Sequence, residues 1–169
     1  MDFNHFLTSY MPDPNIGSKI HFQNMVEQSI LAEKLGYKTV SIPEHHLINL
    51  LMMPSPLQMA VKIASLTKNI SLSTSVAVLP LHDMRTYAGE VSTADILTDG
   101  RLILGVARGA FPWEMKRLGT PIEHSKEKFI ESLEVLQKLL AEEEVSFKGK
   151  YYNFDALTIM PRPITQPVP

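Results

Sequence analysis

An arginine stands between two glycines at the end of an apolar segment. The stretch GRLILGVARGAF, Gly100–Phe111, begins as a buried strand would and then places Arg108 between Gly105 and Gly109. A guanidinium binds phosphate oxygens in a bidentate manner, and glycines let a backbone approach a ligand closely. The pattern favours an anion-binding site at Arg108 and Gly109. The alternative is a surface arginine beside two turn glycines.

Two adjacent histidines follow a glutamate after a second apolar segment. Glu44, His45 and His46 come directly after KTVSIP, residues 38–43. Successive side chains of an extended chain point to opposite sides, so the two imidazoles are poorly placed to share a metal ion, and we expect none. An unperturbed histidine, with a pKa near ~6.5, suits proton transfer. We expect one imidazole to face a cleft and Glu44 to orient a neighbour or bind ligand; a structural role for all three is the alternative.

Three hydroxyl residues interrupt a third apolar segment. Ser73, Thr74 and Ser75 lie within ISLSTSVAVL, residues 70–79. Buried hydroxyls need hydrogen-bond partners, which either a cofactor at the strand end or the neighbouring backbone would supply. The sequence leaves both interpretations open.

Two weaker signals lie nearby. Glu114 follows Arg108 by six residues and could pair with it or lie on a solvated loop. The methionine-rich stretch LINLLMMP, residues 47–54, suits an apolar pocket, a core or an interface, because methionine fills irregular gaps.

The segments that must position these residues alternate between strand and helix. Strand-like runs occupy residues 3–10, 38–43, 70–79 and 102–106, and helical periodicity follows each, at residues 20–35, from Ser55-Pro56 onward, at 84–98 and from Ser125 to Leu140. Ser55 and Ser125 are the expected caps. Val145–Phe154 alternates around Lys-Gly-Lys and predicts a hairpin, and the proline-rich tail excludes a helix or a central strand.

Strict strand–helix alternation predicts a parallel sheet, either barrel or open doubly wound. The glycine fingerprint of the open dinucleotide-binding fold is missing after the first strand. The unusual residues follow strands two to four, whose ends share one face in a parallel barrel. We therefore predict a (β/α) TIM-barrel fold with a hairpin insertion. A whole barrel takes ~250 residues, so residues 1–169 are expected to form one partial domain with the first four units.

Composition excludes several classes of protein. The chain has 169 residues, no cysteine and a net charge of -2, with no basic run, so we expect no disulfide, no Cys-ligated metal and no nucleic-acid partner. Neither a signal peptide nor a membrane-spanning segment is visible. The expectation is a cytoplasmic protein with no membrane partner.

Taken together, the sequence resembles the bacterial luciferase-like family of flavin-dependent monooxygenases. The resemblance rests on IPEHH, TSVAVLP, HDMRTYAGEVSTADILTDGRLILGVARG and the closing MPRPITQPVP, and runs from about Phe3 to the last residue. It implies a (β/α)8 barrel that uses reduced FMN or, in one branch, coenzyme F420. Gly89 stands where alanine is common in the family, and Met84 where proline is, so the substrate stays open.

The resemblance also implies a role for individual residues. His45 matches the family's catalytic histidine, and Arg108 matches an arginine that contacts the flavin phosphate. Ser75-Val76 fall where many members hold a non-proline cis peptide beneath the flavin ring. The implied cofactor-binding set is Glu44, Ser75, Val76, Arg108, Gly109 and Glu114.

The implied activity is the oxidation of a small, apolar organic substrate by O2, with reduced FMN supplied by a separate reductase. The alternatives are an F420-dependent oxidoreductase on the same barrel and a non-catalytic half-barrel that persists as an oligomer. Family members often dimerise through helices that correspond here to Leu57–Leu66 and Met84–Thr98. A half-barrel leaves its first and fourth strands as open edges, so we expect a fragment, a separate chain that supplies the other half, or two copies that pair.

Overall fold

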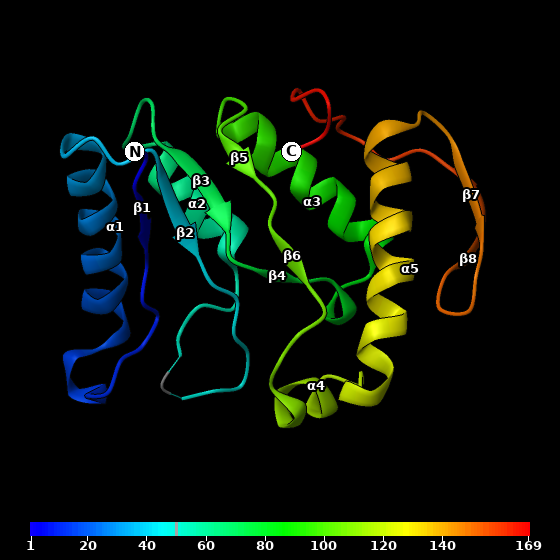
Figure 1. Cartoon of the computed structure of the whole chain (residues 1–169), viewed down its shortest axis with the longest axis horizontal. Helices are drawn as coiled ribbons and strands as arrows, with labels where there is room; N and C mark the ends of the chain where they lie inside the picture. Colours follow the sequence, from blue (N-terminus) through cyan, green and yellow to red (C-terminus); the bar gives the residue numbers. More distant parts are fainter. Residues whose placement is uncertain (50) are drawn as a thin grey trace. The chain divides into compact units, whose positions relative to one another are not determined.

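The computed structural model describes residues 1–49 and 51–169, which form two compact units (Figure 1). The first unit comprises Met1–Ala77 and Leu97–Gly105, and the second Val78–Ile96 and Val106–Pro169. Residue 50, within the methionine-rich stretch, lies outside the described residues. A single partial domain over residues 1–169 stays a prediction.

The first unit is built on a four-stranded parallel sheet, as the alternating pattern predicts. Its strands are β1 (Asn4–Phe6), β2 (Thr39–Ile42), β3 (Ser71–Thr74) and β5 (Leu102–Ile103), in the order β1-β2-β3-β5. Neighbouring strands therefore follow one another along the chain, without the reversal of order that a doubly wound sheet has. The confirmed fold is parallel α/β.

Two helices of the first unit connect these strands. The short 3-10 helix η1 (Pro14–Ile16) precedes α1 (Ser18–Lys34), and α2 (Pro56–Ala64) precedes β3. Helix α1 ends before Gly36, which has a φ of 85° and so provides the predicted stop. Helix α2 begins at Pro56 as expected, but Ser55 makes no capping hydrogen bond to the described residues. The fully buried side chains of this unit include Val40, Ile42, Ala60, Ile63 and Leu72.

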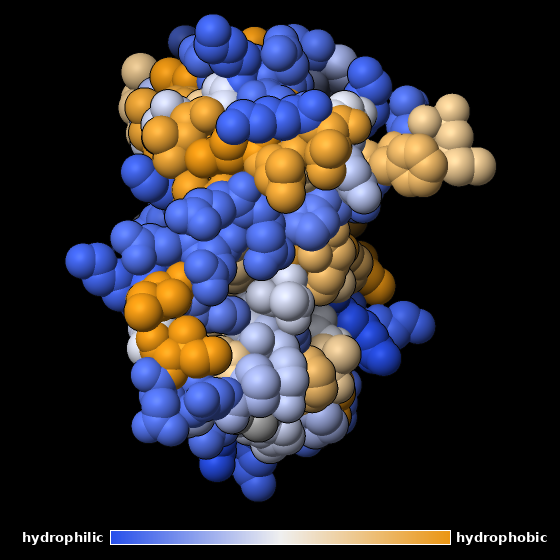
Figure 2. All heavy atoms as spheres, turned by 90° about the vertical axis from the view of Figure 1, so that its left-hand side faces the viewer, coloured by the Kyte–Doolittle hydropathy of each residue, from blue (hydrophilic) through white to orange (hydrophobic). Residues whose placement is uncertain are grey.

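Strand β1 lies at one edge of this sheet and β5 at the other. No other described strand pairs with the outer side of β1, so the open first edge is confirmed. Phe3, just before this strand, and Phe6, its last residue, are 58% and 55% exposed, and Leu31 and Leu35 around the end of α1 are exposed as well. Figure 2 shows this side of the molecule, where apolar areas alternate with polar ones.

A carboxylate at the end of α1 holds the turn that leads into β3. Glu33 accepts hydrogen bonds from the backbone N–H groups of Lys68, Asn69 and Ile70, at 2.9, 2.7 and 3.0 Å to one oxygen. Burial opposes ionisation of this carboxyl, but the three donors outweigh it and hold its pKa below the ordinary value for glutamate. The ionised form therefore stabilises the fold.

We expect Glu33→Gln to lower the free energy of unfolding at pH 7 by about 0.5–1 kcal/mol, a small value because the group is largely solvated. Because the pKa of Glu33 is lower in the folded state, its carboxylate stabilises the folded protein fully at pH values above its unfolded-state pKa of about 4.3. This stabilisation is lost as the pH falls through the folded-state pKa. Urea unfolding at pH 7 and at about pH 3 measures the free energy of unfolding. The difference in this free energy between Glu33→Gln and wild type should vanish at the lower pH. The exposed Glu27→Gln is the control, and a pH-independent difference would contradict the assignment.

The second unit contains three α-helices and two small sheets (Figure 1). Its helices are the 3-10 helix η2 (Leu79–Leu81), α3 (Met84–Leu97), α4 (Pro112–Arg117) and α5 (Ile122–Ala141). Strands β4 (Ala77–Val78) and β6 (Val106–Ala107) pair, and β7 (Val145–Lys148) pairs with β8 (Asn153–Leu157) as the predicted antiparallel hairpin. The tail forms no helix or strand, as its prolines require, and Asp95 in α3 accepts hydrogen bonds from the Ile164 and Thr165 backbone.

Several predicted boundaries are wrong. The expected strands at residues 70–79 and 102–106 are each two strands, and the first strand is shorter than residues 3–10. Helix α4 replaces part of an expected loop. Ser125 is no cap, because Pro121 lets α5 begin three residues earlier, and its hydroxyl instead donates to the Ile122 carbonyl. None of the helices in the described part of the chain has the length and apolarity needed to cross a membrane.

Candidate cofactor site

Two neighbouring strand ends carry the predicted residues of the first unit. Ile42, the last residue of β2, lies opposite Thr74, the last residue of β3. The Ser75 backbone N–H donates to the Ile42 carbonyl oxygen at 2.7 Å. Glu44 and His45 therefore leave the sheet beside Ser75 and Val76, at the carboxyl ends of adjacent parallel strands. This is the end of a parallel sheet where ligands bind in barrels and open sheets alike.

Glu44 contacts the second histidine of the pair. Its carboxylate is buried, and Oε1 lies 2.6 Å from Nε2 of His46. This contact agrees with the expectation that Glu44 orients a neighbour, and the i, i+2 spacing agrees with the alternation of an extended chain. The alternative, that Glu44 binds ligand, stays a prediction. The neighbour is His46, so Glu44 fixes the loop through that side chain.

The loop that carries His45 is anchored to the rest of the first unit. The His45 backbone N–H donates to the Met53 carbonyl at 2.9 Å, and the Met52 N–H donates to the Ser9 carbonyl at the same distance. Residues 44 and 53 are thus held together across the loop between β2 and α2. A side chain on such a loop has a defined position relative to the sheet.

The hydroxyl cluster of the third strand divides into two parts. Ser73 Oγ donates to the Thr74 carbonyl at 3.2 Å, and Thr74 Oγ1 donates to the Gly105 carbonyl at 2.7 Å. For these two residues the backbone supplies the partners. The peptide bond between Ser75 and Val76 is cis, which agrees with the geometry that the resemblance implies.

The glycines around Arg108 have reasons within the chain itself. A Cβ at Gly105 would overlap the carbonyl oxygen of Thr74, so glycine is needed for β3 and the chain after β5 to approach each other. Gly109 has a φ of 87°, and a Cβ there would overlap Sδ of Met115. Packing and backbone conformation therefore account for both glycines, and that they also let a ligand approach closely stays a prediction.

Arg108 follows β6 in the second unit and is exposed. Within residues 1–49 and 51–169 its guanidinium makes no hydrogen bond or ion pair. A carboxylate paired with Arg108 would compete with an anionic ligand for the guanidinium. Because the described residues contain no such partner, the guanidinium is not occupied by another group of the chain. The side chain is therefore available to an anion.

Glu114 does not lie on a solvated loop. It is buried in the first turn of α4, and no ion pair with Arg108 forms among the described side chains. Both expectations for this residue are corrected, because α4 turns the segment after Phe111 inward. Its predicted role in cofactor binding stays a prediction.

The structure thus brings the predicted residues together in two groups. Glu44, His45, Ser75 and Val76 lie at one end of the sheet of the first unit, and Arg108, Gly109 and Glu114 lie between β6 and the end of α4 in the second unit. That both groups face one cofactor stays a prediction.

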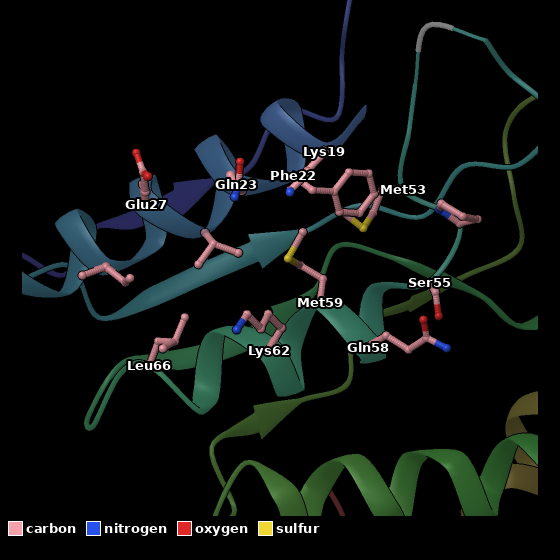
Figure 3. Close-up of a pocket in the computed structure, with 13 residues that line it drawn as sticks. Lys19, Phe22, Gln23, Glu27, Met53, Ser55, Gln58, Met59, Lys62 and Leu66 are labelled. Carbon is pink, nitrogen blue, oxygen red and sulfur yellow. The ribbon is translucent and has the colours of Figure 1, made fainter. Parts of the chain in front are cut away.

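A groove lies between α1 and α2 in the first unit (Figure 3). Met53 and Pro54 of the methionine-rich stretch line it, as one of the alternatives for that stretch predicts, but sequence reasoning missed that α1 forms the opposite wall. It has a volume of about 750 Å³ and an apolar floor that includes Phe22, Met53 and Met59, with Lys19 and Lys62 at its margins. Phe22, Val26 and Ile30, spaced four residues apart on α1, are the sequence signal that could have revealed it. Met53 also accepts the hydrogen bond from His45, so one end of the groove adjoins the anchored loop.

The fold is that of one half of a luciferase-like TIM barrel, and comparison with known proteins identifies the family. A sequence profile of the luciferase-like monooxygenase family matches residues 1–169, so the chain belongs to this family. The chain spans about half the length of the curated relatives it matches.

One relative and two solved structures illustrate the similarity. The oxygenase component of flavin-dependent trigonelline monooxygenase from Acinetobacter baylyi is 29% identical over 150 residues, which cover 88% of this chain and 41% of the relative. Monooxygenase RslO1 from Streptomyces bottropensis superposes with a TM-score of 0.93 at 27% identity, covering 100% of this chain and 52% of that one. An F420-dependent secondary alcohol dehydrogenase, at 20% identity and a TM-score of 0.78, shares the fold over 98% of this chain and 50% of its own.

Proposed function

We propose that the protein is a flavin-dependent monooxygenase that oxidises a small, apolar organic substrate with O2 and reduced FMN. Family membership supports oxidoreductase activity. The observation that carries the proposal is the register of β2 and β3, which places His45 and Ser75-Val76 side by side after two strand ends. The barrel fold uses this end of its strands for chemistry.

The residues of this chain fit a flavin mononucleotide. An exposed guanidinium at Arg108, without a partner among the described side chains, matches the charge and geometry of a terminal phosphate. The anchored loop at His45 supplies an imidazole close to an irregular strand end at Ser75-Val76. When bound, the reduced flavin would supply the electrons with which O2 is activated.

Each residue then has a distinct task. Arg108 holds the phosphate, with Gly109 and Glu114 in the same segment. Ser75 and Val76 support the ring system from the strand end. His45 takes up or donates a proton during substrate oxidation, and the Glu44–His46 hydrogen bond keeps its loop in place. A site that excludes water protects the oxidising species from side reactions.

One relative supports a flavin cofactor and a separate partner component. The trigonelline enzyme is named as flavin-dependent and as an oxygenase component, which favours a two-component system here as well. The F420-dependent dehydrogenase shares the fold alone, and F420 is kept as the alternative cofactor.

Association through the helices at Leu57–Leu66 and Met84–Thr98 remains part of the proposal. The small residues expected to permit close approach, Ala60, Ala64, Ala88 and Ala94, are buried within the chain. The exposed side chains of α2 and α3, such as Gln58 and Glu90, would therefore form such an interface.

Arg108→Ala tests the cofactor assignment. We expect it to weaken FMN binding about tenfold, or 1.4 kcal/mol, because a charge-assisted contact to phosphate is lost. Riboflavin, which lacks the phosphate, should bind wild type and variant equally. Flavin fluorescence titration measures both, and Lys116→Ala, which removes another exposed cation from the neighbouring helix, is the matched control.

Two results would contradict this proposal. Equal FMN binding by wild type and Arg108→Ala would remove Arg108 from the site. Saturable binding of F420 together with no binding of FMN would replace the proposed cofactor by the alternative one.

A further inference from the structure

The second unit contains a polar cavity that the proposed function does not use. It has a volume of about 450 Å³ and lies among η2, the start of α3, α5 and the β7–β8 hairpin. Cavities of roughly 300–1,000 Å³ hold small organic ligands. Its lining includes the charged side chains of Asp83, Arg85 and Lys128, the imidazole of His82, and the apolar side chains of Leu81 and Leu118.

Lys128 is the distinctive group in this cavity. Its Nζ donates to Thr120 Oγ1 at 3.0 Å, and among the residues that the structure describes it has no carboxylate within ion-pair distance. The side chain is half-buried, and burial holds its pKa below the ordinary value for lysine although Asp83 acts in the opposite direction. An ammonium has three N–H donors, so one hydrogen bond leaves two donors for a ligand.

Asp83 does not neutralise this lysine. Its carboxylate is held by Arg85, whose Nε donates to Oδ1 at 2.9 Å, and this hydrogen bond lowers the pKa of Asp83. Arg85 and Lys128 bring two positive charges to the cavity and Asp83 one negative charge, which leaves one positive charge uncompensated among the three. At the rim, Lys150 and Glu127 pair at 2.8 Å and cancel each other.

Part of the remaining wall is hydrocarbon, and His82, Tyr152 and Asn153 add polar groups to it. Leu81 and Leu118 and the ring of Tyr151 line the cavity, and the Tyr151 hydroxyl is already engaged because it donates to Glu127 at 3.0 Å. A ligand that complements this lining has one negative charge and an apolar body. We propose that the cavity binds a small organic monocarboxylate, with its carboxylate on Lys128 and its hydrocarbon part against Leu118 and Tyr151.

Titration with benzoate tests this assignment, which does not depend on the flavin. We expect saturable shifts of the backbone amide resonances of Arg85, Lys128 and Asn153 in ¹H–¹⁵N NMR spectra. Lys128→Met retains the length of the apolar stem and should weaken benzoate binding at least tenfold. Lys126→Met, an exposed lysine on the same helix, should leave the affinity unchanged.

Three ligands measured at equal ionic strength separate the possible occupants. Benzamide, the neutral analogue, and inorganic phosphate should both bind at least tenfold more weakly than benzoate. Equal binding of benzamide would show that the charge of Lys128 is not used, and tighter binding of phosphate would show a site for inorganic anions; either overturns the proposal. So would benzoate binding that survives in Lys128→Met, provided that its spectrum shows a folded protein. Lys128→Arg should keep the site, because it keeps the charge.

Discussion

Replacing His45 with alanine should lower the rate of substrate oxidation about 10²–10⁴-fold, the contribution typical of a positioned proton-transfer group. The binding of FMN should be unchanged, because the proposed phosphate contact is made by Arg108 and not by His45. Incorporation of oxygen from ¹⁸O2 into product, measured by mass spectrometry with reduced FMN in excess, gives the rate. Fluorescence titration with FMN gives the affinity.

His46→Ala is the matched control, because the structure gives the two imidazoles different neighbours. His46 carries the 2.6 Å hydrogen bond to the buried Glu44, so its loss removes a contact of a buried carboxylate and should lower the free energy of unfolding by about 1–3 kcal/mol. His45→Ala should cost less stability and more activity. If both variants retain full turnover, His45 has no part in the chemistry, and if only His46→Ala loses turnover at unchanged stability, the roles of the two histidines are exchanged.

The alternation of strand and helix was predictable because it depends on local periodicity. Phe22, Val26 and Ile30 recur at helical spacing, and Gly36 ends that helix with a positive φ. The spacing of strand and crossover helix also restricts the sheet to parallel pairing. The fold class therefore followed from short-range patterns alone.

The details at the strand ends depend on contacts between distant residues, which no local pattern records. ISLSTSVAVL has the composition of one strand, yet β3 stops at Thr74, where the chain meets Gly105, thirty-one residues later. Glu114 is charged and follows an exposed arginine, yet α4 buries it. Residue types indicate the segments of the candidate site, and tertiary packing decides what each side chain contacts.

Lys128 shows which signal was overlooked. On α5 the positions 128, 132, 135 and 139 recur at helical spacing, and Ser132, Val135 and Leu139 are buried. A lysine in line with a buried stripe is unusual, because lysine is rarely buried without a partner. The apolar residues that give residues 125–140 their helical periodicity are Phe129, Leu133, Leu136 and Leu140, of which two are half-buried, and this set does not include Lys128.

Gly105→Ala should lower the free energy of unfolding by about 3 kcal/mol, the upper part of the range for overpacking. The added methyl would overlap the carbonyl oxygen of Thr74, a backbone atom that cannot rotate away as a side chain would. The overlap can be removed only if the backbone around residue 105 moves. This movement would break the hydrogen bonds that the Gly105 carbonyl accepts from Thr74 Oγ1 at 2.7 Å and from the Ala77 N–H at 2.8 Å.

Gly89→Ala should change the free energy of unfolding in the opposite direction, and it serves as the control for the steric overlap at residue 105. Gly89 lies within α3, and a Cβ there would meet only the Met160 carbonyl oxygen at 3.7 Å, an ordinary contact. Alanine in a helix interior is favoured over glycine by about 0.5–1 kcal/mol, so this variant should be more stable than wild type. Urea unfolding followed by circular dichroism measures both variants. The two variants should therefore differ by about 4 kcal/mol, of which about 3 kcal/mol comes from the surroundings of residue 105. Similar stabilities would show that the Thr74 carbonyl does not lie as close to residue 105 as the structure has it.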